Sequence, residues 1–418
     1  MTDRPKLERP RGTHDVVPAE MPGWQRVTGE IDRLCALFGY RKILTPVFED
    51  TALFARTSGA GSDVVQKEMY TFADRSDRSL TLRPEGTAPI CRAYVEHGMH
   101  RDPQPVKLFT IAPMYRYGAP GRGRYREHWQ ASVEALGSDD PSIDAELIHL
   151  YDTLLARLGV TRYHLELNSI GCRDCRPAYL DTLRAWLADN AARLDEDTRA
   201  KVEVSPLRVF DNYLAKPPAV REALDEAPRI GESLCAACVA HFAAVRADLD
   251  ATGVSYTLVP TLVRGLDYYT RTTFEFIGPL ENQNSTITGG GRYDYLIEEI
   301  GGPPTPGIGF GAGIERLLIA MEEEGVPEPP EAGIDVFIAL DDGAPRPTVA
   351  RWLAELRRAG VAAETDYAGR SLKGQLTQAR RLDARSVVIV GAETATLRRP
   401  GTADEVLDHA EIVSRLSP

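Results

Sequence analysis

The residues best suited to chemistry lie in one stretch, Lys107–Glu134, which reads KLFTIAPMYRYGAPGRGRYREHWQASVE. Both of its ends have strand character, because residues 108–111 favour a pleated sheet and residues 129–134 alternate in polarity. The middle, residues 117–126, contains three glycines, one proline and three arginines, and so fits neither a strand nor a helix. The stretch therefore predicts a long antiparallel hairpin with a flexible, cationic tip.

The alternation divides the second strand of this hairpin into two faces. Gln130, Ser132 and Glu134 share the polar face. The opposite face is expected to pack against a core, and it carries Trp129, Ala131 and Val133. A carboxylate and an amide suit an amine-bearing ligand, whereas arginines suit phosphates. Four arginines lie on the same hairpin: Arg116, Arg122, Arg124 and Arg126. The pattern indicates a site that joins an amine-bearing compound to a phosphate compound; the alternative is a surface hairpin with solvated charges.

Two further stretches place polar groups in special settings. In RPEGT, proline and glycine make a rigid loop that could present Glu85 and Thr87 to an ammonium group, although most loop glutamates are merely solvated. In LVRGLDYYTRTTFEF, Arg264 lies among apolar residues and close to Tyr268 and Tyr269. A partly desolvated cation at this position is expected to meet an anion.

Alternate glycines mark a later strand, in which Gly307, Gly309, Gly311 and Gly313 are separated by apolar residues. This spacing differs from a dinucleotide-binding fingerprint, and it strips one face of the strand to bare backbone, against which a flat ligand could lie. Arg316 follows in the first turn of a predicted helix, where anions are favoured. The chain contains no G-x-x-x-x-G-K-S/T sequence, which excludes a P-loop enzyme.

Four of the six cysteines form two C-x-x-C pairs, Cys172 with Cys175 and Cys235 with Cys238. Paired knuckles of this kind supply the ligands of a structural tetrahedral zinc ion. The stretch between the pairs is longer than in a compact zinc ribbon, so the fold would have to close the site. The alternative is four reduced thiols that bind no metal.

Bulk composition bounds the class of protein. The chain has 418 residues, enough for two or three domains, with 43% hydrophobic and 26% charged residues. No apolar run approaches the length of a membrane span, and the polar N-terminus lacks the apolar segment of a secretory signal, so a cytosolic protein is expected. The net charge is −12, but local basic clusters still permit RNA binding.

Around these residues the sequence predicts an ordered set of elements. Apolar residues stepping by three and four over 24–38 predict a helix, and Tyr40–Glu49 predicts a strand whose Pro46 places it at an edge or a junction. Strand signals vanish over 171–252, which indicates a helical insertion. After a Pro-rich linker, residues 334–390 alternate between strands and helices and predict a small α/β domain with a largely parallel sheet.

Together these motifs resemble those of the class II aminoacyl-tRNA synthetases, and within them the histidine-specific family, over nearly the whole chain. The helix and strand around Pro46 resemble the first class motif, Tyr115–Glu134 the second, and Gly307–Leu318 the third. Leu262–Phe276 and Gly290–Tyr293 resemble the histidine-specific signatures.

The resemblance implies an α+β catalytic domain, residues 1–325, with a central antiparallel sheet flanked by helices and interrupted by the helical insertion 171–252. A linker, 326–333, would join it to an α/β anticodon-binding domain, 334–418. The implied activity is the ATP-dependent attachment of L-histidine to tRNA(His) through a histidyl-adenylate. The protein would be a cytoplasmic homodimer that uses Mg²⁺, and its insertion would contact the tRNA acceptor arm.

The resemblance also implies roles for single residues. Glu85, Thr87 and Gln130 would hold the α-ammonium group of histidine. Glu134 and Tyr269 would read its imidazole, in a pocket shaped by Tyr268 and Tyr293. Arg116 and Arg264 would be the catalytic groups on the α-phosphate, and Arg316 would bind the γ-phosphate. The remaining ATP contacts would come from Arg124, Tyr125, Gly309 and Gly311.

One position departs from the family pattern. The glutamate that usually follows the arginine of the second motif by two residues is Gly118 here, so adenine would rest on backbone or stack on Tyr125. The alternative function is that of a paralogue, the histidine-sensing regulatory subunit of ATP phosphoribosyltransferase. Such paralogues typically lose the catalytic arginines and the C-terminal module, whereas Arg116, Arg264, Arg316 and the residues from 334 onward are present here.

Overall fold

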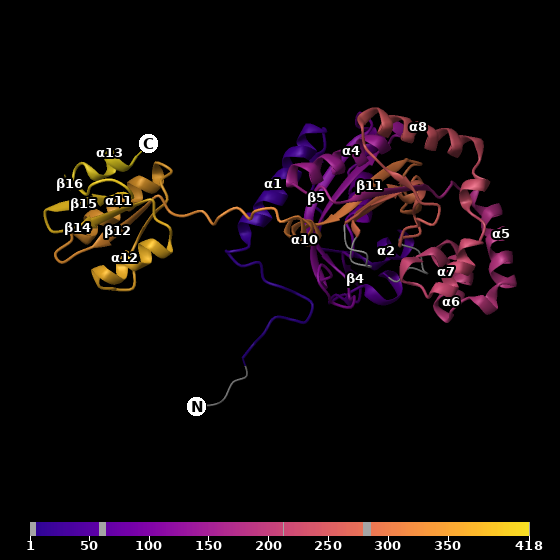
Figure 1. The fold of residues 1–418 in the computed structure, drawn as a ribbon, viewed down its shortest axis with the longest axis horizontal. Coiled ribbons are helices and arrows are strands. Elements are labelled where there is room, and N and C mark those ends of the chain that lie inside the picture. The colour runs from indigo at the N-terminus through magenta and orange to yellow at the C-terminus, as the bar shows by residue number, and fades with distance from the viewer. Residues whose placement is uncertain (1–5, 58–63, 212, 279–285, 418) are drawn as a thin grey trace. The chain divides into compact units, whose positions relative to one another are not determined.

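The computed structural model describes residues 6–57, 64–211, 213–278 and 286–417. The chain divides into two compact units, Met1–Glu328 and Pro329–Pro418, and the division falls within the Pro-rich stretch 326–333 (Figure 1). Within the described ranges no single helix is long and apolar enough to cross a membrane. One sharply bent pair, Pro218–Ser233 with Ala236–Thr252, meets that test by length and composition alone.

The first unit is built on an eight-stranded sheet in the order β1-β5-β6-β11-β10-β9-β7-β8. Its interior pairs are antiparallel, and only the edge pairs β1/β5 and β7/β8 are parallel, so the predicted central antiparallel sheet is confirmed. The strands are β1 Arg41–Lys42, β5 Val106–Tyr115, β6 Glu127–Leu136, β7 His164–Ser169, β8 Thr257–Leu258, β9 Thr270–Ile277, β10 Thr286–Arg292 and β11 Gly307–Gly313. The predicted hairpin is β5 and β6, paired in register from Val106↔Leu136 to Tyr115↔Glu127.

The single strand predicted at Tyr40–Glu49 is wrong, because this stretch forms two short strands in different sheets. β1 lies at the edge of the large sheet, while β2 (Phe48–Asp50) pairs with β4 (Ser79–Leu82) in a three-stranded sheet completed by β3 (Thr71–Ala73). Pro46 lies between them and has no N–H to continue a ladder. At this interruption the side chain of Arg83 takes the place of a ladder partner, because it donates a hydrogen bond to the carbonyl oxygen of Thr45 at 2.9 Å.

Four helices cover one face of the large sheet: α1 Met21–Leu37, α4 Pro141–Leu158, α8 Ala236–Thr252 and α10 Ile314–Glu324. The inward residues Ala131 and Val133 of β6 are buried in this core, as the alternation predicts. Tyr151 of α4 packs its ring 5.0 Å from that of Phe310 in β11. Trp129 departs from the prediction, because it is 37% exposed, although its ring makes an edge contact with Trp24 of α1.

The remaining helices of the first unit lie beyond this core: α2 Thr51–Thr57, α3 Thr87–Glu96, α5 Arg176–Asp189, α6 Glu196–Val204, α7 Pro218–Asp225 and α9 Leu296–Glu299. A short π-helical turn spans Val64–Glu68, and 3₁₀ turns span Met99–Arg101, Ala191–Arg193, Pro206–Phe210, Tyr213–Ala215 and Ile230–Ser233. The inserted helices α5–α7 bury a small core of their own. Helix α8 belongs to both regions, because Cys238 lies with the insertion while Val245 and Leu249 are buried in the main core.

The second unit contains a five-stranded sheet in the order β13-β12-β14-β15-β16. Its elements are β12 Val336–Leu340, α11 Arg346–Arg358, β13 Ala363–Thr365, α12 Leu372–Arg381, β14 Ser386–Val390, β15 Thr394–Arg398, β16 Glu405–Asp408 and α13 Ile412–Leu416. The predicted alternation is confirmed for β12–β14, which pair in parallel. The largely parallel sheet is correct only for those three strands, because β15 and β16 add two antiparallel pairings that the sequence analysis missed.

A fully buried arginine fastens the end of β10 to α4. Arg292 has no exposed side-chain surface and pairs with Asp144 at 2.5 Å and with Asp294 at 3.0 Å. Its second terminal nitrogen donates to the carbonyl oxygen of Ser138 at 2.6 Å. Burial raises the pKa of Asp144 to about 6, while Arg292 opposes that shift. The pairing therefore holds the strand that borders the site described below.

We predict that Asp144→Ala lowers the free energy of unfolding of the first unit by about 3–5 kcal/mol, because it leaves a buried guanidinium short of a partner. Urea unfolding followed by fluorescence measures the change. The matched control is Asp32→Ala, which removes an ion pair whose side chains are 46% and 45% exposed and should cost at most about 1 kcal/mol. Equal losses of unfolding free energy in the two variants would contradict a stabilising role for the buried Asp144–Arg292 pair.

Candidate active site

Two neighbouring strands expose bare backbone on the face of the sheet opposite the helical core. Gly309 and Gly311 of β11 lie in register with Gly291 and Gly289 of β10. Across β11, Gly309 pairs with Glu134 and Gly311 with Ser132 of β6. Because side chains of paired residues share a face, the polar row of β6 borders a floor of four glycines, which we call the glycine floor.

Side chains from neighbouring segments occupy the space above the glycine floor. A Cβ added at Gly309 would lie 1.7 Å from Glu134 Oε2, and one at Gly311 would lie 2.6 Å from Gln130 Nε2. On β10, a Cβ at Gly289 would lie 2.4 Å from Arg264 Nη1 and one at Gly291 would lie 3.0 Å from Tyr269 Cδ1. The floor is therefore where the predicted carboxylate, amide, arginine and tyrosine converge. The alternate glycines predict open space for a ligand here, and they also make room for these four side chains.

Two buried carboxylates line this pocket. Glu134 accepts hydrogen bonds from Thr87 Oγ1, at 2.7 Å, and from the hydroxyl of Tyr293. Burial raises the pKa of Glu134 well above its ordinary value, and the two hydroxyl donors oppose the shift. Glu85 accepts from the backbone N–H groups of Thr87, at 2.6 Å, and Ala88, at 2.9 Å, and burial raises its pKa too. The pocket therefore holds two acids in surroundings that favour an incoming positive charge.

Three tyrosines form the pocket wall. The ring centroids of Tyr268 and Tyr269 lie 4.7 Å apart, and those of Tyr268 and Tyr293 lie 5.8 Å apart in an edge contact. A Cβ at Gly307 would lie 2.4 Å from the Tyr293 ring, so this glycine makes room for the wall. Gln130 completes the polar row by donating to Ser132 Oγ at 2.9 Å. All seven residues predicted to form one pocket are thus close together, and their individual roles stay predictions.

The predicted arginines extend this site toward the hairpin tip. Arg116 follows β5 and donates through Nε to the carbonyl oxygen of Pro84, at 2.7 Å, next to Glu85. Burial, with Arg124 and then Arg116 adding to it, lowers the pKa of Arg316. Arg264 pairs with Glu275 of β9 and lies 6.0 Å from the ring centroid of Tyr269. Anionic groups are therefore favoured along this side of the glycine floor.

His128 belongs to the same cluster, although the sequence analysis did not select it. Burial lowers its pKa to about 3, with Arg116 and Arg316 adding to the effect. The signal was available, because His128 has the same parity on β6 as Gln130 and Glu134 and so extends the polar row. Ser132 lies on that row as well, and Glu275 and Gly289 complete the site from β9 and β10.

Comparison with known proteins agrees with this arrangement. The sequence profile of the family described as histidyl-tRNA synthetase matches residues 12–317. The chain belongs to the histidyl-tRNA synthetase family. A histidine–tRNA ligase of Moorella thermoacetica is 48% identical over 385 residues, which cover 92% of this chain and 90% of that protein. One of Desulforamulus reducens is 48% identical over 386 residues, covering 92% and 91%.

Solved structures give the same result. The apo histidyl-tRNA synthetase of S. aureus superposes on this synthetase with a TM-score of 0.82 and 35% identity, covering 98% of this chain and 100% of that one. A protein of Bacillus halodurans C, described as an ATP phosphoribosyltransferase regulatory subunit/histidyl-tRNA synthetase, has a TM-score of 0.66 and 24% identity, with 93% and 99% covered. At that identity the second match shows a shared fold alone.

The residues predicted at the hairpin tip of the synthetase have different neighbours in the structure. Arg122 points away from the pocket, because it pairs with Glu322 at 3.0 Å and Glu323 at 3.1 Å on α10. Tyr125, the predicted stacking partner of adenine, has its ring centroid 4.5 Å from that of His14. At Gly118, where the family has glutamate, an added Cβ would lie 3.5 Å from Glu68 Oε1. A carboxylate therefore stands beside this point of the hairpin, supplied by another segment.

Four cysteines form the candidate metal site of the synthetase, outside the pocket. The Sγ atoms of Cys172, Cys175, Cys235 and Cys238 all lie within 4.8 Å of one another. The structure thus brings together all four residues predicted as zinc ligands.

The raised pKa of Glu134 gives a pH prediction. Because folding raises the pKa of Glu134, the folded protein releases this proton at a higher pH than the unfolded chain, whose pKa is about 4.3. The contribution of this group to stability is therefore present below that value and is lost as the pH rises, by at most about 1.4 kcal/mol per pH unit. We expect Glu134→Gln, which cannot titrate, to lose less thermal stability than the wild type between about pH 5.5 and about pH 8.

Melting temperatures measured across this range test the pH prediction. Glu322→Gln, at a side chain that is 71% exposed, is the control and should follow the wild-type curve. If Glu134→Gln also follows that curve, Glu134 does not retain a proton in the folded state.

Proposed function

We propose that this synthetase attaches L-histidine to tRNA(His) in two steps, through a histidyl-adenylate made from ATP. The observation that carries the proposal is the convergence above the glycine floor of a buried carboxylate pocket and a guanidinium group, since Glu134, Gln130 and Arg264 all approach the same four glycines. An amino acid and a nucleotide bound over one floor would have their reacting groups side by side.

The chemistry of the pocket suits histidine. Glu85, Thr87 and Gln130 would hold the α-ammonium group, while Glu134 and Tyr269 would hydrogen-bond the imidazole between Tyr268 and Tyr293. A cationic or donor group from the ligand would stabilise Glu134 as an anion, a form that burial alone disfavours. A pocket built to hydrogen-bond its substrate rejects an analogue lacking those groups by roughly 10⁴-fold or more.

The arginines would bind the nucleotide. Arg116 and Arg264 would contact the α-phosphate, and Arg316 the γ-phosphate. Arg124, Tyr125 and the backbone of Gly309 and Gly311 would provide further contacts. Mg²⁺ enters with ATP as part of the substrate and screens the charge of the departing pyrophosphate.

In the first step, an oxygen of the histidine carboxylate attacks the α-phosphorus and the bond to the bridging oxygen of the β-phosphate breaks. Pyrophosphate leaves with the electron pair, and no proton needs to move. Because two anions must approach, Arg116 and Arg264 would stabilise the charge that gathers at phosphorus, each contributing roughly a few kcal/mol. Glu275, which pairs with Arg264, would hold that guanidinium in place over the floor.

In the second step, a hydroxyl of the terminal ribose of tRNA attacks the carbonyl carbon of the adenylate. The bond to the phosphate oxygen breaks, AMP leaves with the electron pair, and the proton of the attacking hydroxyl is released to the departing phosphate or to water. Residues 334–418 would bind the anticodon and the inserted helices 171–252 the acceptor arm. We further propose a cytoplasmic homodimer formed through α1 and the segment around Pro46, and a structural Zn²⁺ on the four cysteines.

The test of function is an exchange assay between ATP and pyrophosphate with each amino acid in turn, followed by charging of unfractionated tRNA. Exchange with histidine alone and a charged tRNA(His) are expected. A protein that binds histidine but supports neither reaction would be a regulatory subunit. The presence of Arg116, Arg264 and Arg316 and of the second compact unit favours the enzyme.

Arg264→Ala should reduce histidine-dependent pyrophosphate exchange by orders of magnitude, because it removes a cation from the α-phosphate while the sheet stays folded. The control is Arg122→Ala, which removes a tip arginine that pairs with α10 and should keep exchange near the wild-type rate. Circular dichroism checks the fold of both variants. Near-normal exchange by Arg264→Ala would refute its catalytic role.

Two substitutions should raise the KM for histidine by taking the Glu134 carboxylate out of its position. Glu134→Ala removes the carboxylate. Gly309→Ala displaces it, because the new Cβ would lie 1.7 Å from Glu134 Oε2 and the backbone oxygen of Val133, 2.8 Å away, leaves the Cβ no other room. We expect at least a tenfold rise for each, a loss of about 1.4 kcal/mol or more in binding. Gly313→Ala is the control on the same strand, since its Cβ would meet Arg316 only at 3.6 Å. An unchanged KM in Glu134→Ala would remove Glu134 from the pocket.

A further inference from the structure

The four cysteines lie where the inserted helices leave and rejoin the main sheet. Cys172 and Cys175 follow β7 directly, and Cys235 and Cys238 stand at the start of α8. Cys172 and Cys235 are 63 positions apart in the sequence, as are Cys175 and Cys238, yet the Sγ atoms of the first two lie 3.8 Å apart and those of the second two lie 3.9 Å apart. The cluster therefore closes the base of the insertion.

The sulfur positions fit one tetrahedral ion. Four sulfurs at the usual Zn–S distance of about 2.3 Å stand about 3.8 Å apart along each edge of the tetrahedron. The Cys172–Cys175 separation is also 3.8 Å, and all four Sγ atoms lie within 4.8 Å. These separations are too long for a disulfide, whose sulfurs lie about 2.0 Å apart.

The loop around the first pair is shaped to hold anionic sulfur. The backbone N–H of Cys172 donates to Cys175 Sγ at 3.2 Å, and that of Asp174 donates to Cys172 Sγ at 3.4 Å. Gly171 has a φ of +69°, and a Cβ there would lie 2.8 Å from Cys175 Sγ, so the turn requires glycine. Hydrogen bonds from backbone N–H groups to thiolates are favourable because they stabilise the charged form.

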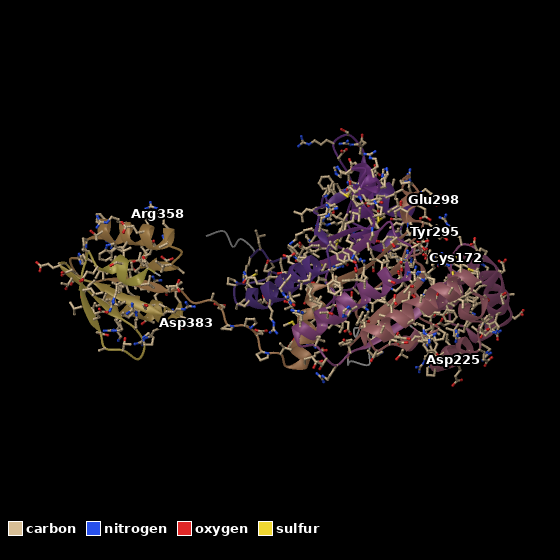
Figure 2. All side chains as sticks on the ribbon, turned by 90° about the horizontal axis from the view of Figure 1, so that it is seen from above. Cys172, Asp225, Tyr295, Glu298, Arg358 and Asp383 are labelled. Atoms are coloured by element: carbon tan, nitrogen blue, oxygen red, sulfur yellow. The ribbon has the colours of Figure 1, made fainter. Side chains whose placement is uncertain are left out.

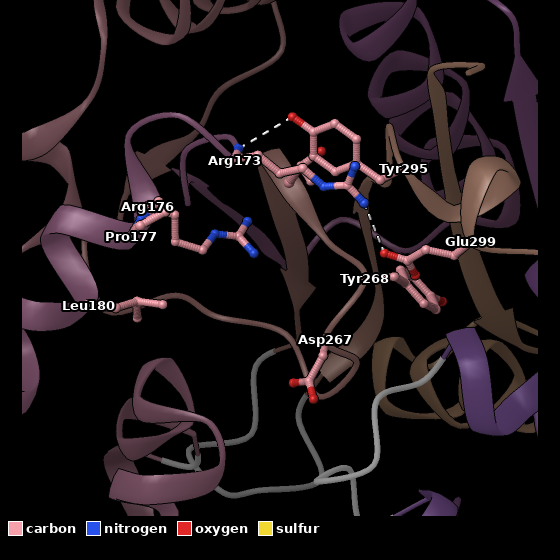
Figure 3. A pocket seen from close by; sticks show the side chains of 9 residues that line it. Arg173, Arg176, Pro177, Leu180, Asp267, Tyr268, Tyr295 and Glu299 are labelled. Carbon is pink, nitrogen blue, oxygen red and sulfur yellow. Dashed lines mark hydrogen bonds and ion pairs between the residues drawn. The ribbon is translucent and has the colours of Figure 1, made fainter. Parts of the chain in front are cut away.

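Two arginines of the cysteine loop have different neighbours: Arg176 contacts the tyrosine wall of the active-site pocket, and Arg173 contacts α9. Arg176 Nη2 donates to the carbonyl oxygen of Tyr269 at 2.6 Å and to that of Gly171 at 3.2 Å. Arg173 stacks its guanidinium 3.7 Å from the ring centroid of Tyr295 and pairs with Glu298 at 3.1 Å on α9. Cys172 lies near Tyr295 and Glu298 (Figure 2). Both arginines line a cavity of about 200 Å³, which Tyr268 also lines (Figure 3).

We propose that these cysteines bind one structural Zn²⁺, and that this ion fixes the loop from which Arg176 holds the Tyr269 wall of the histidine pocket. Four sulfur ligands leave no open position, so the ion would have no direct part in the reaction. The effect on the pocket rests on the proposed function, whereas the binding of zinc does not.

The first test measures metal in the purified full-length protein by inductively coupled plasma mass spectrometry after dialysis. About one zinc per chain is expected, falling to a small fraction in Cys172→Ser and Cys235→Ser. Protein produced with Co²⁺ should show the sulfur-to-cobalt charge-transfer absorption of a four-thiolate site. Cys35→Ala, at a buried cysteine of α1, is the control and should keep its zinc. A wild-type protein without zinc, or with iron in its place, overturns the proposal.

The second test asks whether Arg176 supports the tyrosine wall of the histidine pocket while the zinc content stays unchanged. Arg176→Ala should keep its zinc yet raise the KM for histidine several-fold with little change in kcat, since the Tyr269 carbonyl loses its donor. Arg173→Ala, which contacts α9 rather than Tyr269, is the matched control and should leave that KM near its wild-type value. An unchanged KM in Arg176→Ala would overturn the coupling. Failure of the function itself would appear instead in the wild type, as an absence of histidine-dependent exchange.

Discussion

The active site depends on two adjacent strands that lack side chains where they pass beneath it. Each glycine in a strand costs roughly 0.5–1 kcal/mol relative to alanine, and the glycine floor contains four of them. The opposite face compensates, because Ile308 and Phe310 of β11 are fully or almost fully buried, and Phe274 of β9, which pairs with Gly290 of β10, is fully buried beside them. One pair of strands thus combines a well-packed core with a surface open enough for side chains from three other segments to meet.

The polar row of β6 changes character along its length. Glu134 lies at the buried end, where desolvation favours a protonated acid, and His128 lies toward the hairpin tip, where burial and two arginines favour a neutral imidazole. Between them, Gln130 and Ser132 are hydrogen-bonded to each other. A single strand therefore runs from surroundings that attract cations to surroundings that attract anions, which is the polarity that an amino acid and a nucleotide require when they bind end to end.

Local patterns predicted the hairpin, the alternating glycines and the main helices, because each depends on residues close in sequence. They could not predict what lies over the glycines, since Arg264 and Glu134 reach Gly289 and Gly309 only through strand pairings between distant segments. The strand expected at Tyr40–Glu49 failed for a related reason: its two halves join different sheets. The strands β15 and β16 were missed because their residues alternate only weakly in polarity, and it is their antiparallel pairing with each other and with β14 that makes them strands.

The closed base of the insertion has a consequence for the architecture of the first unit. Because Cys172 and Cys235 stand with their sulfurs 3.8 Å apart, the chain leaves β7 and returns to α8 at nearly the same point. The inserted helices bury a small core of their own, while α8 continues into the main core. The excursion therefore begins and ends at one point of the first unit, so the part of it beyond the cysteine loop could change in length without moving the ends of β7 and α8.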